Sequence, residues 1–139
     1  MTDDTAGGDP ARDGWILVED EGFIATVGPL YVREGIYAFR AGQKHANLIG
    51  VVHGGMLMSF ADRALGVTAM AAADGASCVT IQLEMKFLDA GRMGDWLTCR
   101  SIVVKRTGSL VFMRGEVHDG ERLVASADGV WKILRRRPA

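Results

Sequence analysis

NLIGVVHGGMLMSFADRALG, residues 47–66, is the stretch of this 139-residue sequence on which the fold depends. Two glycines follow His53, and the apolar run behind them is dominated by Ala, Leu and Met, which favour helix. The pattern predicts a helix that begins near Gly54 or Gly55 and ends near residue 73. Because this helix is apolar on nearly every side, we expect it to be buried rather than to lie on a surface.

Segments typical of strands flank this helix on both sides. Asp74 and Gly75 should end the helix, since glycine readily takes the left-handed conformation of a helix cap. The pairs Glu34-Gly35 and Asp119-Gly120 indicate tight turns between strands. In the strand at 79–88, apolar residues alternate with a polar set that includes Thr80. We expect strands at residues 23–27, 30–32, 36–40, 79–88, 96–105, 110–118 and 123–133.

These elements predict an α+β fold in which a curved antiparallel sheet wraps around one long central helix. A sheet buries one face and needs a partner layer, and the helix supplies it. The last four strands are expected to form a meander. Strands and helices do not alternate, which disfavours a parallel doubly wound fold. We expect one domain at residues 15–134, a disordered tail at 1–14 and a basic tail at 135–139.

Composition excludes several classes of function. The net charge is −1, so no global field favours nucleic acid or a membrane surface as a partner. Asp62-Arg63 interrupts the longest apolar run, which argues against a membrane span, and the N-terminus lacks the features of a secretory signal. Cys78 and Cys99 lack the spacing of a zinc site or redox pair and are expected to be buried thiols. We therefore expect a soluble cytoplasmic protein without a metal site.

The start of the helix and Asp62 are the candidates for chemistry. A helix N-terminus presents free amides and a partial positive charge, and Gly54 and Gly55 would let an anion or an oxyanion approach them. The glycines could equally serve only a tight turn into the helix. Because an unpaired buried carboxylate is costly, Asp62 either lies on a narrow solvent-facing stripe with Arg63 or acts as a general base or nucleophile.

Helix geometry separates these two features. Gly55 and Asp62 are seven residues apart, so they share a face of the helix but lie about 10 Å apart along its axis. A base and an oxyanion donor that serve one carbonyl must both lie about 3 Å from the reacting atoms. If both serve one substrate, they come from two copies of the chain, which predicts a symmetric homo-oligomer with the helix at its interface.

The sequence also contains the pattern N-x-x-G-x-x-H-G-G followed by an aspartate on the helix, here Asn47, Gly50, His53-Gly54-Gly55 and Asp62. This pattern resembles the hotdog-fold acyl-CoA thioesterases, specifically the phenylacetate-pathway (PaaI-like) branch of the 4-hydroxybenzoyl-CoA thioesterase superfamily. The resemblance covers roughly residues 22–134. It implies hydrolysis of an acyl-CoA to free acid and coenzyme A with water and no cofactor. It also implies a sheet of five or six strands whose subunits pair through an edge strand into homodimers or homotetramers.

The resemblance assigns roles to individual residues. The Gly55 amide would polarise the thioester carbonyl, and Asp62 of the facing subunit would activate water or attack directly. Asn47 would hold substrate or water, while His53 would orient the loop and contact the acyl-thioester region.

A hydroxyl on the strand after the helix would position water in such an enzyme. Thr80 occupies that place and Ser77 is the alternative, although strand alternation puts Thr80 on the polar face with Gln82. The coenzyme A phosphates need cations and amide donors. Candidates are Gly54, Lys105, Arg106 and the amides of Thr107, Gly108 and Ser109, with Arg92 and the tail at 135–137 behind them.

Two other functions fit a hotdog fold. One is a non-catalytic module that binds acyl-CoA as a sensor or carrier, since fold alone does not fix function. The other is a dehydratase, but its own His/Asp motif is not found in the sequence.

Overall fold

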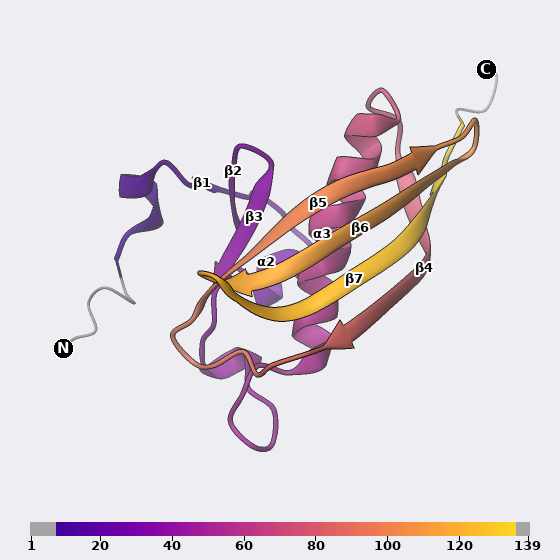
Figure 1. Cartoon of the computed structure of the whole chain (residues 1–139). Coiled ribbons are helices and arrows are strands. Elements are labelled where there is room, and N and C mark those ends of the chain that lie inside the picture. Colours follow the sequence, from indigo (N-terminus) through magenta and orange to yellow (C-terminus); the bar gives the residue numbers. More distant parts are fainter. Residues whose placement is uncertain (1–7, 136–139) are drawn as a thin grey trace.

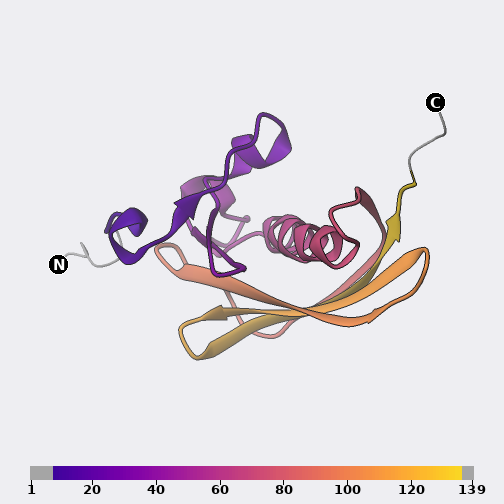
Figure 2. The same cartoon turned by 90° about the horizontal axis from the view of Figure 1, so that it is seen from above.

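Within residues 8–135, one long helix, α3 (Gly54–Ala72), lies in the hollow of a curved antiparallel sheet of seven strands (Figure 1). The computed structural model describes residues 8–135. Figure 2, which looks almost along α3, shows the sheet curving around one side of the helix. The predicted α+β fold is confirmed. The predicted stop is confirmed as well, because Asp74 and Gly75 follow the helix with positive φ angles of 58° and 85°.

The order of the strands differs from the predicted meander. β5, β6 and β7 are neighbours as expected, but β4 pairs with β7 and not with β5. The connection at residues 88–95 passes the N-terminal end of α3, where the Val52 amide donates to the Gly91 carbonyl at 2.7 Å, and this detour leaves β4 at the edge. Across the sheet the strands are β1 (Ile16–Leu17), β2 (Tyr31–Arg33), β3 (Ile36–Arg40), β5 (Trp96–Arg106), β6 (Leu110–Asp119), β7 (Arg122–Ile133) and β4 (Cys78–Phe87).

Residues 23–27, predicted as a strand, form the short helix α2 (Phe23–Val27). Ile, Thr, Val and Phe favour strands, but contacts made by the fold override that preference here. Ile24 packs into the core, and the His45 ring lies 2.6 Å from the Val27 carbonyl oxygen. The Nδ1 atom of His45 accepts from the Gly42 amide, so Nε2 carries the proton and donates to Val27.

Part of the predicted N-terminal tail is structured. The 3₁₀ helix η1 (Pro10–Asp13) is capped by the Asp9 carboxylate, which accepts from the Ala11 amide at 3.0 Å. Trp15 is buried, and its ring meets the Trp96 ring edge-on with centroids 5.3 Å apart. Residues 1–7 and 136–139 of the two predicted tails lie outside the described residues. A second 3₁₀ helix, η2 (Gln43–His45), precedes α3. No helix within residues 8–135 is long and apolar enough to span a membrane.

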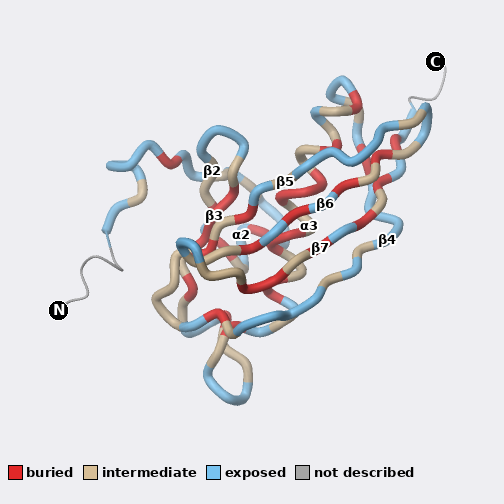
Figure 3. Tube along the Cα trace, viewed as in Figure 1, coloured by how far each residue is buried: buried red, intermediate tan, exposed pale blue. Residues whose placement is uncertain are grey.

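The hydrophobic core lies between α3 and the concave face of the sheet (Figure 3). Alanines on α3 allow the strands to approach the helix closely, and larger side chains fill the remaining space. Both cysteines are buried and unpaired, as predicted. The largest fully buried side chains are Trp131, Phe39, Phe60, Leu30, Leu65, Leu97 and Met113.

A bulge in β4 corrects the predicted orientation of Thr80. Thr80 lies opposite Trp131 and Gln82 lies opposite Val130, so Ile81 is an extra residue on this strand. The extra residue shifts the alternation by one. Ile81 is therefore 55% exposed rather than facing the core, and Thr80 turns towards α3.

Two glycines make room for this arrangement. A Cβ atom on Gly129 would lie 2.5 Å from the backbone oxygen of Gln82, at the bulge, and 2.9 Å from the Trp131 ring. On the helix side, a Cβ atom on Gly66 would lie 3.0 Å from Nε1 of Trp131. The indole therefore fits between α3 and the sheet only because both neighbours lack a side chain.

Gly129→Ala should destabilise the fold by about 1–3 kcal/mol, because the added methyl group forces the bulged strand away from β7. Thermal unfolding of this variant and of Gly108→Ala measures the effect. The control adds a methyl group where the nearest atom is 3.9 Å away, at the flexible end of Arg135. Equal melting temperatures for the two variants would show that β4 can shift to accommodate the methyl group without a loss of stability.

Candidate active site

Asp62 lies in the middle of α3 and is hydrogen-bonded to the edge strand. The hydroxyl group of Thr80 donates to Oδ1 of Asp62 at 2.5 Å. The bulge in β4 creates this contact, and Thr80 rather than Ser77 makes it. Oδ2 of Asp62 has no hydrogen-bond partner within residues 8–135, so it remains available to a proton or to a substrate.

Arg63 does not neutralise Asp62. Its guanidinium pairs instead with Asp20, which precedes α2. The hydrogen bond from Arg63 lowers the pKa of Asp20, and the Gly22 amide, at 2.6 Å, adds to this shift. Asp62 and Arg63 line the same two cavities beside α3, but each has its own partner, Thr80 for Asp62 and Asp20 for Arg63.

Asp62 borders two cavities. One, of about 290 Å³, is lined by Asp20, Phe23, Ile24, Ser59, Asp62 and Arg63. The other, of about 260 Å³, shares Asp62 and Arg63 with the first and is lined in addition by residues that include Thr80 and Trp131. A carboxylate in an apolar helix is tolerable here because one oxygen has a donor and both cavities open to water.

The start of α3 is capped by His53. Its Nδ1 atom accepts from the Gly55 amide at 2.8 Å, so the amide expected to polarise a carbonyl is occupied in this structure. Such a bond requires a neutral imidazole whose Nδ1 is unprotonated. The Gly54 amide has no hydrogen-bond acceptor within the described chain, and the Phe87 ring lies beside this glycine. A cavity of about 340 Å³ reaches His53 and Gly55 from the side of α2.

Asn47 organises the loop before α3. Its side-chain oxygen accepts from the backbone amides of Ile49 and Val51 at 3.0 and 3.2 Å. Its backbone amide donates to the Val51 carbonyl at 2.8 Å. Gly50 completes the turn with a φ of 85°. Among the polar groups of Asn47, the side-chain NH₂ is the one without a partner within residues 8–135.

Five residues predicted to bind coenzyme A phosphates, Lys105 to Ser109, lie at the other end of α3. Arg106 donates to the Ala72 carbonyl at 3.0 Å and to Asp74 at 2.9 Å, just past the helix C-terminus. In the turn that follows, Thr107 and Ser109 already use their amides within the turn. α3 has 19 residues, so within one subunit these groups lie about 28 Å from Gly54, itself a candidate for the same phosphates. Lys105 and Gly108 are exposed beside them.

Arg122 is a structural residue that the sequence pattern did not reveal. It donates to the Ala90 carbonyl at 2.7 Å and pairs with Asp95 at 2.7 Å, Asp89 at 3.1 Å and Asp119 at 3.3 Å. These contacts hold the 88–95 connection that in turn pairs with the loop before α3. No local signal in the sequence marks pairs that are 27 or 32 residues apart.

Within residues 8–135, the two cysteines and the histidines other than His53 offer no alternative site. Burial raises the pKa of Cys78 and raises that of Cys99 to about 12, so neither thiol is a ready nucleophile. His45 is buried and fully bonded, and His118 lies 3.8 Å from Glu116. Residues 8–135 contain no group of three His, Cys, Asp or Glu side chains placed to hold a metal ion.

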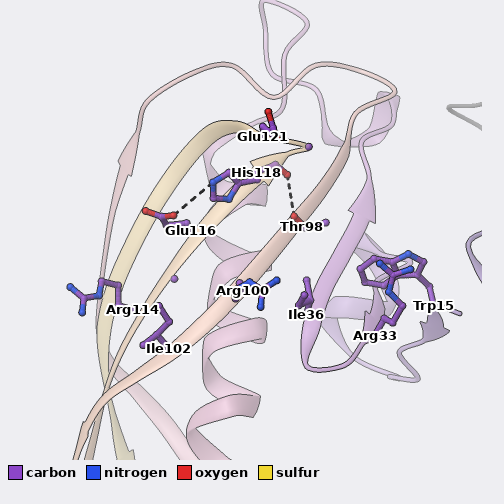
Figure 4. A pocket seen from close by; sticks show the side chains of 12 residues that line it. Trp15, Arg33, Ile36, Thr98, Arg100, Ile102, Arg114, Glu116, His118 and Glu121 are labelled. Carbon is purple, nitrogen blue, oxygen red and sulfur yellow. Dashed lines mark hydrogen bonds and ion pairs between the residues drawn. The ribbon is translucent and has the colours of Figure 1, made fainter. Parts of the chain in front are cut away.

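A larger cavity, of about 770 Å³, contains none of the predicted site residues (Figure 4). Thr98 and Arg100 line it from β5 and alternate with Leu97 and Cys99, which are buried beneath α3. The cavity therefore lies on the opposite face of the sheet from Asp62. The candidate chemistry stays with the smaller cavities along α3.

Comparison with known proteins identifies the family of the chain. The family model of the Thioesterase superfamily matches residues 49–126, which include the start of α3, Asp62 and Thr80. The chain belongs to the Thioesterase superfamily. The predicted class of enzyme, a thioester hydrolase, is thereby confirmed at the level of the family. A Pseudomonas aeruginosa protein assigned as an esterase, PA0474, is 36% identical over 123 residues, covering 84% of this chain and 92% of the relative.

Solved structures of low sequence identity share the fold. Zebrafish thioesterase superfamily member 2 matches with a TM-score of 0.77 at 19% identity, over 84% of this chain and 89% of that one. BH2602 of Bacillus halodurans, solved with coenzyme A, matches with a TM-score of 0.73 at 24% identity, over 83% and 78% of the two chains. The predicted hotdog fold is confirmed, and the described part of the chain has seven strands in its sheet where the resemblance implied five or six.

His53→Ala should destabilise this thioesterase-family protein by about 1 kcal/mol, because the Gly55 amide loses its cap. His53→Asn should retain most of the stability, since asparagine is among the best residues at this position. Chemical denaturation of both variants measures the difference. A His53→Ala variant as stable as the asparagine variant would contradict the capping role.

Proposed function

We propose that this protein is an acyl-CoA thioesterase that hydrolyses an acyl-CoA to a free acid and coenzyme A, as a PaaI-like member of its family. The observation that carries the proposal is the Asp62 carboxylate, which sits in an otherwise apolar helix, is oriented by Thr80 and borders two cavities. A relative of this fold was solved with coenzyme A. Water is the only co-reactant, and no cofactor or metal is required.

In this proposal Asp62 acts first as a base. The free Oδ2 removes a proton from water, the water oxygen bonds to the thioester carbon, and the carbonyl oxygen becomes an oxyanion. The carbon–sulfur bond then breaks, and the coenzyme A thiolate takes up the proton. Direct attack by Asp62 through an anhydride reaches the same products. Thr80 fixes the carboxylate in either case and is a positioning residue.

The oxyanion needs donors, and the helix start offers two. The Gly54 amide is unpaired within residues 8–135, and the Gly55 amide is bonded to His53. We expect the substrate oxygen to replace Nδ1 of His53, so the histidine holds the amide in position until substrate arrives. Asn47 keeps its NH₂ group for substrate or water.

A second copy of the chain would bring the two halves together. β4 is an edge strand of 10 residues, and exposed Val79 and Ile81 lie on it. Antiparallel pairing of β4 with its own copy would place the partner's Phe87 end beside the Cys78 end. The helix start that packs against Phe87 would then approach Asp62 and Thr80. We therefore propose a homodimer, alone or within a tetramer, with active sites shared between subunits.

Pairing also gives the predicted phosphate ligands a role. Lys105, Arg106, Thr107, Gly108 and Ser109 lie far from the helix start of their own subunit but at the end of α3 that the partner's helix start would approach. Lys105 and the Gly108 amide are the donors without a partner within residues 8–135. We propose that they meet the coenzyme A phosphates.

Asp62→Asn should lower kcat at least 100-fold with little change in KM, because the base is lost while the shape of the side chain is kept. Thr80→Val should lower kcat less. Release of free thiol from a panel of acyl-CoAs measures both. Asp128→Asn and Thr68→Val, which change an exposed aspartate and a threonine bonded within α3, are the matched controls. Full activity in Asp62→Asn would exclude this residue as base or nucleophile, and tight binding without turnover in the wild type would indicate a carrier or sensor.

Mixing two inactive variants tests whether the site is shared. Asp62→Asn removes the carboxylate, and Gly55→Pro removes the amide while keeping a residue that the first helical turn tolerates. If each site takes Gly55 from one subunit and Asp62 from the other, refolding the two variants together should restore about a quarter of wild-type activity. No recovery in a mixture shown to contain mixed dimers would place both groups in one subunit.

A further inference from the structure

Phe23, at the start of α2, lies between two cavities on the proposed active-site face. It lines the cavity of about 340 Å³ that reaches His53 and Gly55, and also the cavity of about 290 Å³ that reaches Asp62. Ser59 lines the same two cavities from α3, and its hydroxyl group donates to the Gly55 carbonyl at 2.8 Å. Phe23 and Ser59 are therefore common to the compartment beside Gly55 and the compartment beside Asp62.

α2 is held firmly enough to form a wall. Before it, Asp20 pairs with Arg63 of α3. After it, buried His45 donates to the Val27 carbonyl at 2.6 Å. Ile24 is anchored in the core, yet Phe23 leaves 62% of its surface exposed. An exposed aromatic ring on a fixed helix presents apolar area to a ligand at little cost in conformational entropy.

The compartment next to the helix start is small and mainly apolar. Phe23, Val27, Ala46 and Met56 contribute its apolar walls, and Lys44 lies at its polar rim. Its volume is at the lower end of the range for small-molecule sites. It has room for a compact acyl group, and Phe23 lies between it and the second compartment, which borders Asp62 of the same subunit.

We propose that Phe23 is the specificity-determining residue of the enzyme and that it selects short or compact acyl groups by closing the compartment beside Gly55. This inference rests on the proposed function. Removing the ring would join the compartments and admit longer chains, whereas enlarging it would shorten the accepted chain.

The test compares wild type, Phe23→Ala, Phe23→Leu and Phe23→Trp on straight-chain acyl-CoAs from acetyl to lauroyl. The ratio of kcat/KM for lauroyl over butyryl substrate should rise about tenfold or more in Phe23→Ala, rise less in Phe23→Leu and fall in Phe23→Trp. Ile16→Ala removes an apolar side chain that is 67% exposed on β1, outside both compartments, and should leave the ratio unchanged. An unchanged ratio in folded Phe23→Ala and Phe23→Trp would overturn the proposal.

Binding separates this inference from the proposed function. If wild type hydrolyses none of these substrates, the proposed function fails. Calorimetry with uncleavable thioether analogues of the same chain lengths then still tests Phe23. A shift of the preferred acyl-chain length in Phe23→Ala supports the proposed role of Phe23. The same preferred length in wild type and Phe23→Ala overturns it.

Discussion

The hydrogen bond from Thr80 to Asp62 connects the central helix to the edge strand of the sheet, and several features of the surrounding structure make this bond possible. A carboxylate in the middle of an apolar helix needs a donor or access to solvent. Asp62 has the Thr80 hydroxyl as a donor and borders an open cavity. The donor faces the helix because β4 contains a bulge, and the bulge fits against β7 because residue 129 is a glycine. The Asp20–Arg63 pair has a complementary effect, since Arg63, the residue after Asp62, is paired with a different carboxylate.

The sequence was sufficient to predict those elements whose cause is local. α3 begins at a predicted glycine and ends at the predicted stop, because residue composition and a left-handed cap act within a few positions. The strands after it were found by their composition and turns. Three features depend on distant contacts, and for these the prediction from sequence is wrong: it gives a strand in place of α2, puts β4 beside β5 and contains no bulge to reorient Thr80. Each is decided by residues far along the chain, such as His45 for α2.

For the candidate site, the sequence predicts which residues are present better than which of their polar groups are already hydrogen-bonded. Asp62 and Thr80 come together, and His53 lies against Gly55, but the Gly55 amide and the Asn47 side-chain oxygen are already bonded. A motif specifies which polar groups are present, but it does not specify which of them form hydrogen bonds with each other. The ion pairs of Arg63 and Arg122 link residues 43 and 27 positions apart, which no local pattern reports. The roles assigned by resemblance stay predictions.

The arrangement of α3 separates folding from catalysis. The core between α3 and the sheet is complete within one chain, so nothing in it requires a partner. The proposed chemistry does require one, because two turns of a rigid helix hold the amide donors and the carboxylate about 10 Å apart. Neither group can move along the helix to close that gap, and the side chain of Asp62 is further restrained by Thr80. Bringing them to one carbonyl is therefore a matter of symmetry rather than flexibility. The same contacts that fix each half-site, His53 on Gly55 and Thr80 on Asp62, would preorganise the shared site before substrate binds.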